Sequence, residues 1–281
     1  MPGETRLHYQ EELVELERRA LEGLDLVVAT LDRTIEAVEN QDVELAELVI
    51  ADDDRIDGRY LEVHQSILTL LATQAPVASD LRLISALLHV MKCMERMGDQ
   101  CVNIAKLIPV AGHEPPADEE MLRDISTMGK QARSLITQAK RAFADRDVGL
   151  ARDLVRQDDV IDNLNREAFA VALRIGDTED RREWAMTMML VARAMERIGD
   201  NAVDVGEQVA FVSPACSGSS RTPRTPARPR RSRRLSRAGV HRSFTRRSRG
   251  VHPRGATTAD TDHTWGSGPG STCTVTRSPR G

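Results

Sequence analysis

Aromatic residues are scarce in this chain of 281 residues, which contains only 2 Trp, 2 Tyr and 4 Phe. Strands of β-sandwiches and β-barrels are enriched in aromatic and β-branched side chains, so this scarcity argues against both classes. No apolar run approaches the roughly 18 to 20 residues that a membrane-spanning helix needs. The first residues also lack the basic and then apolar pattern of a signal peptide. We therefore expect a cytoplasmic protein.

Cysteine is scarce too, with four in the whole chain. Cys93 and Cys101 are eight residues apart, so on one helix they would lie about 12 Å apart along the axis, too far for a disulfide. No pair of cysteines has the spacing of a zinc ribbon. The pattern fits the reducing conditions of the cytoplasm.

The small net charge of −4 hides two segments of opposite charge. Residues 214–281 contain 15 Arg, no Lys, two acidic residues, 7 of the 12 Pro and 8 of the 18 Gly, for a formal charge of +13. The preceding 213 residues carry −17. The basic tail has too little apolar carbon to offset the entropy of ordering it, so we expect it to be disordered. The body is strongly acidic, and we expect it not to bind nucleic acid.

Two hypotheses account for the tail. Its dense arginines would bind the phosphates of nucleic acid or of anionic lipid electrostatically. Alternatively, a chain with 15 Arg and no Lys among Pro, Ala, Gly, Ser and Thr is typical of a GC-rich gene translated out of frame. Because the helical pattern stops abruptly before Ser213, we favour a frameshift near that residue.

An internal repeat organises the body. Three pairs of segments match in the same order, residues 41–46 with 146–151, 53–57 with 158–162, and 94–99 with 195–200, at offsets of 105, 105 and 101. Three ordered matches indicate a duplicated unit of about 100 residues.

Each unit has the apolar periodicity of three long helices. In the first unit we expect helices over about 4–39, from an N-cap at Asp42 to Gln74, and from a cap at Ser79 or Asp80 to Pro109. The second unit repeats the pattern, with turns at 145–147 and 176–177. The predicted fold is all-α, with two tandem antiparallel three-helix bundles at 1–108 and 118–213, a linker at 109–117 and the disordered tail at 214–281.

Pairs of acidic residues occupy positions four apart on the second and third helices of both units. The eight positions are Asp53, Asp57, Glu95, Asp99, Asp158, Asp162, Glu196 and Asp200. Side chains four apart lie on one helix face, where like charges repel. Such rows need a counter-charge, which is either a bound cation or neighbouring arginines such as Arg55, Arg96, Arg166 and Arg197.

Carboxylate oxygens on facing helices suit Mg, Mn, Ca or iron, so the rows predict a shared cation. The alternative is a solvated acidic face held by salt bridges. A di-metal carboxylate enzyme, oxidase or metal store would need histidine ligands, typically in Glu-x-x-His. Neither His64 nor His89 is four residues from one of these acids, and we interpret both as core or surface residues.

Gly98 and Gly199 recur beside the acids, inside predicted helices where glycine costs about 1 kcal/mol relative to alanine. We interpret them as points where two helices approach closely.

Taken together, these residues resemble a known family. Residues 95–105 (ERMGDQCVNIA) and 196–204 (ERIGDNAVD) resemble the paired signature of the PhoU family, and residues 74–82 (QAPVASDLR) resemble the turn before its third helix. The resemblance extends over about residues 4–212. The 68-residue tail matches nothing in the family pattern, and Asn103 stands where the second copy has Asp204, so the two acidic sites are expected to differ.

The resemblance implies two three-helix bundles whose eight motif acids carry multinuclear metal, either iron or Mg, Mn or Zn. It also implies a non-enzymatic negative regulator of phosphate uptake and phosphate-starvation signalling. The implied partners are the ATPase subunit of a phosphate ABC transporter, a membrane sensor histidine kinase and a second copy of the chain, which would bring the cytoplasmic protein to the membrane.

Overall fold

The computed structural model describes residues 2–111, 118–175 and 178–213, with side chains from Leu7 onward. Within these residues every regular element is a helix, which confirms the all-α class. The elements are α1 Pro2–Asn40, α2 Val43–Ala51, α3 Asp53–Thr73, α4 Ala78–Leu107, the 3-10 turn η1 Pro109–Ala111, α5 Glu119–Asp145, α6 Val148–Ile175 and α7 Glu179–Val212.

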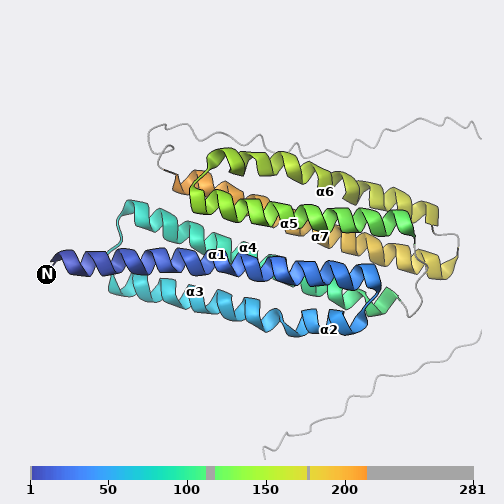
Figure 1. Cartoon of the computed structure of the whole chain (residues 1–281), viewed down its shortest axis with the longest axis horizontal. Coiled ribbons are helices and arrows are strands. Elements are labelled where there is room, and N and C mark those ends of the chain that lie inside the picture. Colours follow the sequence, from blue (N-terminus) through green and yellow to red (C-terminus); the bar gives the residue numbers. More distant parts are fainter. Residues whose placement is uncertain (1, 112–117, 176–177, 214–281) are drawn as a thin grey trace, which may run out of the picture. The chain divides into compact units, whose positions relative to one another are not determined.

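The helices form the two expected three-helix bundles (Figure 1). In the first bundle α1 packs against α3 and α4, with α2 continuing the line of α3. In the second, α5, α6 and α7 pack against one another. The bundles also pack together, because α4 contacts α7 and α1 contacts α5. The helices α3 and α6 lie on the outer sides (Figure 1).

One predicted element is divided. The helix expected from Asp42 to Gln74 is interrupted at Asp52, which separates α2 from α3. Asp52 has a ψ of −5° instead of the usual helical value, and its carboxylate pairs with Arg33 of α1 and lies 3.7 Å from Arg55. The three consecutive aspartates at 52–54 are poor helix formers. The ion pair between Asp52 and Arg33 therefore lies where the helix is intrinsically weak.

The helix ends agree with the sequence in part. Asp42 caps α2 as predicted, accepting a hydrogen bond from the Leu45 amide at 2.9 Å. The cap expected at Ser79 or Asp80 is instead Val77, and Asp80 serves the third position of α4, accepting from the Val77 amide at 3.2 Å. This exchange follows from the side chain of Asp80 reaching back over the first turn.

The same turn opens the second helix of each copy. Gln41 and Arg146, related by the repeat offset of 105, both have positive φ, 53° and 54°. Each lies directly after a helix of its bundle and before an aspartate that accepts amide hydrogen bonds from the next helix. The duplication therefore extends to backbone conformation.

Some predictions fall on residues outside the described ranges. Of the predicted linker at 109–117, residues 109–111 form η1 and the others are not described. The turn at 176–177 and the predicted disorder of the tail at 214–281 also lie outside the described residues.

The core is continuous through both bundles. The apolar row that identified the first helix is buried along α1, for example at Leu24 and Leu31, which are 1% and 0% exposed. Methionines fill much of α4, where Met91, Met94 and Met97 are all fully buried. Unbranched side chains fit irregular gaps between long helices, so the core needs few aromatic residues.

Candidate functional site

The first acidic cluster lies between α3 and α4. Asp53 is in the first turn of α3 and faces Gly98 of α4, since a methyl group added at Gly98 would lie 3.7 Å from Asp53 Oδ1. The same methyl group would lie 3.0 Å from Ile56 Cδ1. This confirms the close helix approach expected at Gly98. The acids of the two helices are therefore neighbours across the contact.

Mutual repulsion is evident within this cluster. Burial raises the pKa of Asp53 above its usual value, and the charges of Asp57 and Asp99 raise it further. Burial also raises the pKa of Asp99, with Glu95 and Asp57 adding to the effect. The four predicted residues therefore share one region of negative potential. A cation bound there would relieve that repulsion.

Among the described residues, Glu95 is the one acid of this cluster that has a cation directly beside it. Lys92 Nζ lies 2.6 Å from Glu95 Oε2, one turn away on α4. Arg55 is directed to Asp52 instead of to the predicted ligands. The alternative of helical salt bridges is thus realised for Glu95, whereas Asp57 and Asp99 are exposed to solvent.

The second cluster lies between α6 and α7 and is more buried. Asp158 and Glu196 are each 6% exposed, whereas Asp162 and Asp200 are half-buried. A methyl group added at Gly199 would lie 2.5 Å from Asp158 Oδ1. This contact confirms the close approach predicted at Gly199, and it is tighter than the one at Gly98.

Glu196 pairs with an arginine one turn away on α7. Its Oε1 accepts a hydrogen bond from Arg193 Nη1 at 2.6 Å, while its Oε2 is buried without a hydrogen-bond partner in the described structure. Burial raises the pKa of Glu196, and the charges of Asp200 and Asp162 raise it further against the lowering effect of Arg193. A buried acceptor without a donor is costly, so an incoming cation would find an oxygen ready to bind it.

Each predicted quartet thus lies on one pair of neighbouring helices, but in the described structure its carboxylate oxygens are too far apart for three of them to coordinate one ion together. Among the described residues, no three of the eight acids have ligand oxygens within 4.8 Å of one another. One group does meet that distance, formed by His89, Cys93 and Asp204. Sequence reasoning missed it, although the spacing of four between His89 and Cys93 was a usable signal.

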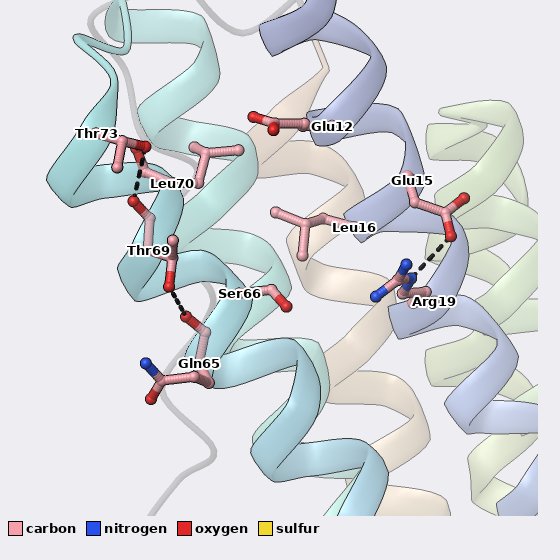
Figure 2. A pocket seen from close by; sticks show the side chains of 9 residues that line it. All are labelled: Glu12, Glu15, Leu16, Arg19, Gln65, Ser66, Thr69, Leu70 and Thr73. Atoms are coloured by element: carbon pink, nitrogen blue, oxygen red, sulfur yellow. Dashed lines mark hydrogen bonds and ion pairs between the residues drawn. The ribbon is translucent and has the colours of Figure 1, made fainter.

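A pocket of about 300 Å³ lies between α1 and α3 (Figure 2). Its lining residues are Glu12, Glu15, Leu16, Arg19, Gln65, Ser66, Thr69, Leu70 and Thr73. The three hydroxyls each donate to a carbonyl of their own helix. Hydrogen bonds from Arg18 and Arg19 lower the pKa of Glu15 to about 2. The hydroxyls of the lining are therefore engaged by their own helix, and the two arginines hold Glu15 as a carboxylate.

No helix among the described residues is long and apolar enough to cross a membrane. The fold and the sites together define a class: a duplicated three-helix bundle with facing carboxylate pairs at glycine-mediated helix contacts. A family model described as "PhoU domain" matches residues 21–108 and 125–209. The chain belongs to the PhoU family.

The similarity to known proteins extends over both bundles. The chain is 31% identical over 210 residues to a protein of Clostridium acetobutylicum named "Phosphate-specific transport system accessory protein PhoU homolog", covering 74% of this chain and 95% of that protein. It is 32% identical over 212 residues to homolog 1 of Mycobacterium leprae, covering 73% and 92%. The crystal structure of PhoU from Pseudomonas aeruginosa superposes with a TM-score of 0.67 at 26% identity, covering 73% of this chain and 98% of that one.

Proposed function

We propose that this protein is a negative regulator of phosphate uptake and of phosphate-starvation signalling. It acts as a non-enzymatic adaptor between the ATPase subunit of a phosphate ABC transporter and a membrane sensor histidine kinase. The observation that carries the proposal is the alignment of both bundles with relatives named as accessory proteins of a phosphate-specific transport system, over 95% and 92% of their lengths.

An adaptor needs surfaces for its partners, and the outer helices offer them. Leu61 on α3 is 63% exposed, and Phe169 and Leu173 on α6 are 54% and 72% exposed. Large apolar side chains on charged helices are typical of protein–protein contacts. These surfaces support docking to cytoplasmic parts of membrane proteins, and to a second copy in a homodimer.

Metal is the second part of the proposal. The two quartets, Asp53, Asp57, Glu95 and Asp99, and Asp158, Asp162, Glu196 and Asp200, would hold iron, Mg, Mn or Zn through carboxylate oxygens. Two observations support the fit of these residues to a cation: the buried Oε2 of Glu196 and the repulsion between carboxylates within each quartet. When bound, the metal supplies positive charge that fixes α3 against α4 and α6 against α7. The chain's own residues position those helix pairs at Gly98 and Gly199.

A reporter assay tests the regulatory role. In cells that lack this protein and carry a phosphate-starvation reporter, the full chain should silence the reporter in phosphate-rich medium. A copy ending at Ser213 should silence it equally if the basic tail is dispensable. A reporter that stays on while the full chain is present and folded would overturn the proposed function.

Metal analysis of the purified full chain tests the second part separately. D99N and D200N should each lower the metal content by about half, because each removes a ligand from one of two clusters. The matched controls are D54N and D159N, which neutralise exposed acids next to predicted ligands. Equal metal content in all four variants would contradict the carboxylate sites without touching the regulatory proposal.

A further inference from the structure

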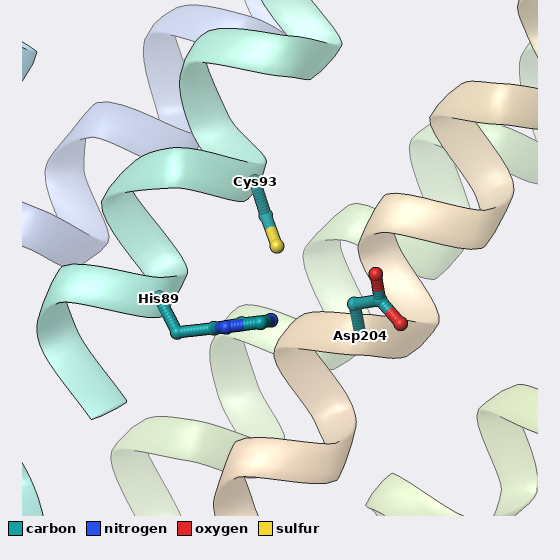
Figure 3. A group of neighbouring side chains, drawn as sticks. All are labelled: His89, Cys93 and Asp204. Atoms are coloured by element: carbon teal, nitrogen blue, oxygen red, sulfur yellow. The ribbon is translucent and has the colours of Figure 1, made fainter. Parts of the chain in front are cut away.

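His89, Cys93 and Asp204 lie together where α4 packs against α7 (Figure 3). One ligand atom of each residue lies within 4.8 Å of the others. His89 and Cys93 come from α4 and Asp204 from α7, and the Cys93 sulfur and the end of the His89 ring point toward Asp204 (Figure 3). None of the three belongs to the acidic quartets.

His89 and Cys93 lie one turn apart on α4, and Asp204 faces them from α7 (Figure 3). Residues four apart on a helix present neighbouring side chains on one face. Cys93 is 1% exposed and fixed by the core, whereas His89 is exposed, so an ion can reach the group from solvent. Within the described residues, neither the His89 side chain nor the Asp204 side chain makes a hydrogen bond or ion pair.

We propose that these three residues form a binding site for a single zinc ion. Zinc accepts imidazole nitrogen, thiolate sulfur and carboxylate oxygen as ligands, with tetrahedral geometry. Bond lengths of about 2.0 to 2.3 Å place tetrahedral ligand atoms about 3.3 to 3.8 Å apart. The ligand atoms lie within 4.8 Å of one another, so zinc binding would require the side chains of His89 and Asp204 to turn inward. The three residues leave the fourth position to water.

The second repeat lacks the site. At the repeat offset of 101, the counterparts of His89, Cys93 and Asp204 are Leu190, Ala194 and Asn103. Leu190 is exposed and Ala194 is 6% exposed, so each is as accessible as its counterpart, but neither offers a donor atom. The expected stoichiometry is therefore one zinc ion per chain, whereas the carboxylate clusters occur twice.

Cys93 could be buried only because it packs in the core, and not because it binds zinc. Buried free cysteines often act as small apolar side chains, and Cys101 on the same helix is fully buried outside the group. Cys101 is thus a matched control for Cys93. Because zinc would join α4 to α7, it would also stabilise the contact between the two bundles.

Titration with Co²⁺ is the test, because cobalt substitutes for zinc and a bound thiolate gives a charge-transfer band that carboxylate sites cannot give. The full chain is used with Cys216→Ser and Cys273→Ser, so that Cys93 and Cys101 are the remaining thiols. We expect a thiolate band that saturates at one equivalent and disappears when Zn²⁺ is added.

The variants assign the ligands. C93A should abolish the band, and H89N and D204N should weaken cobalt binding at least about tenfold, while C101A and D54N should leave the titration unchanged. Circular dichroism establishes that each variant is folded. H89N and D204N alter accessible side chains, so they keep the proposal testable if C93A fails to fold. A folded parent chain without the band, a band retained in C93A, or full affinity in both H89N and D204N would overturn the zinc site.

Discussion

Replacing Gly199 by alanine tests the tightest helix contact of the acidic sites. The added methyl group would lie 2.5 Å from Asp158 Oδ1, 3.1 Å from Ile161 Cδ1 and 3.6 Å from Leu135 Cδ1. Overpacking of this kind costs about 1 to 3 kcal/mol. Alanine recovers up to about 1 kcal/mol through its higher helix propensity. We therefore expect G199A to lower the free energy of unfolding by up to about 2 kcal/mol.

Gly58 provides the matched control. It lies within α3, is exposed, and has no atom within 4 Å of an added methyl group. G58A should raise the free energy of unfolding by about 1 kcal/mol, because only helix propensity changes. For a body of this size, 1 kcal/mol corresponds to about 2 to 4 °C in Tm.

Thermal unfolding followed by circular dichroism of the metal-free chains measures both effects. G199A should melt up to about 8 °C below the parent chain and G58A about 2 to 4 °C above it. Equal stabilisation by the two substitutions would refute the reasoning, because it would mean that α6 and α7 do not need glycine in order to approach at this point. Such a result would also remove the reason for placing Asp158 against α7.

Three further predictions concern the rest of the body. Burial raises the pKa of Asp124 in the folded chain. The protonated Asp124 side chain therefore contributes stability below its usual pKa of about 4, and this contribution is lost as the pH rises through the folded value. D124N should raise Tm at pH 7 and leave it unchanged in acid. Arg146 has a φ of 54° and donates two hydrogen bonds of 2.6 and 2.7 Å to Glu17. In denaturant titration R146A should lower the free energy of unfolding by about 1 to 2 kcal/mol, and R146G should lower it by about 1 kcal/mol less, because glycine adopts the left-handed conformation without strain. A larger loss in R146G than in R146A would contradict this role of the left-handed backbone. Asp118 caps α5 by accepting from the Met121 amide at 2.9 Å, so D118A should lower the free energy of unfolding by about 1 kcal/mol, whereas D118N should retain most of it.

The helices and the two quartets could be predicted because their signals are local and repeated. Apolar spacing along α1, the cap at Asp42 and the glycines at 98 and 199 each point to a structural feature within a few turns. The pairing of acids across helices followed from the duplication, since both copies placed them on the second and third helices. Whether metal occupies these positions stays a prediction.

The interruption at Asp52 could not be predicted from periodicity. The apolar pattern continues from α2 into α3, with Val49 and Ile56 both buried. What differs is the partner of Asp52, Arg33, which lies on another helix. The poor helix propensity of the three aspartates makes a break at this point low in free energy, but the break itself depends on the ion pair with Arg33 of α1.

The group of His89, Cys93 and Asp204 shows why a duplicated fold need not have duplicated sites. The repeat brings α4 and α7 together, and this contact does not require the same side chains on both helices. One side of the contact therefore lacks the imidazole, the thiol and the carboxylate, because Asn103 stands in place of a second aspartate and Leu190 and Ala194 in place of histidine and cysteine. A zinc ion there would bind one end of the α4–α7 contact and not its repeat-related counterpart. The two bundles would then be joined asymmetrically, and a partner that contacts both would meet two non-equivalent halves.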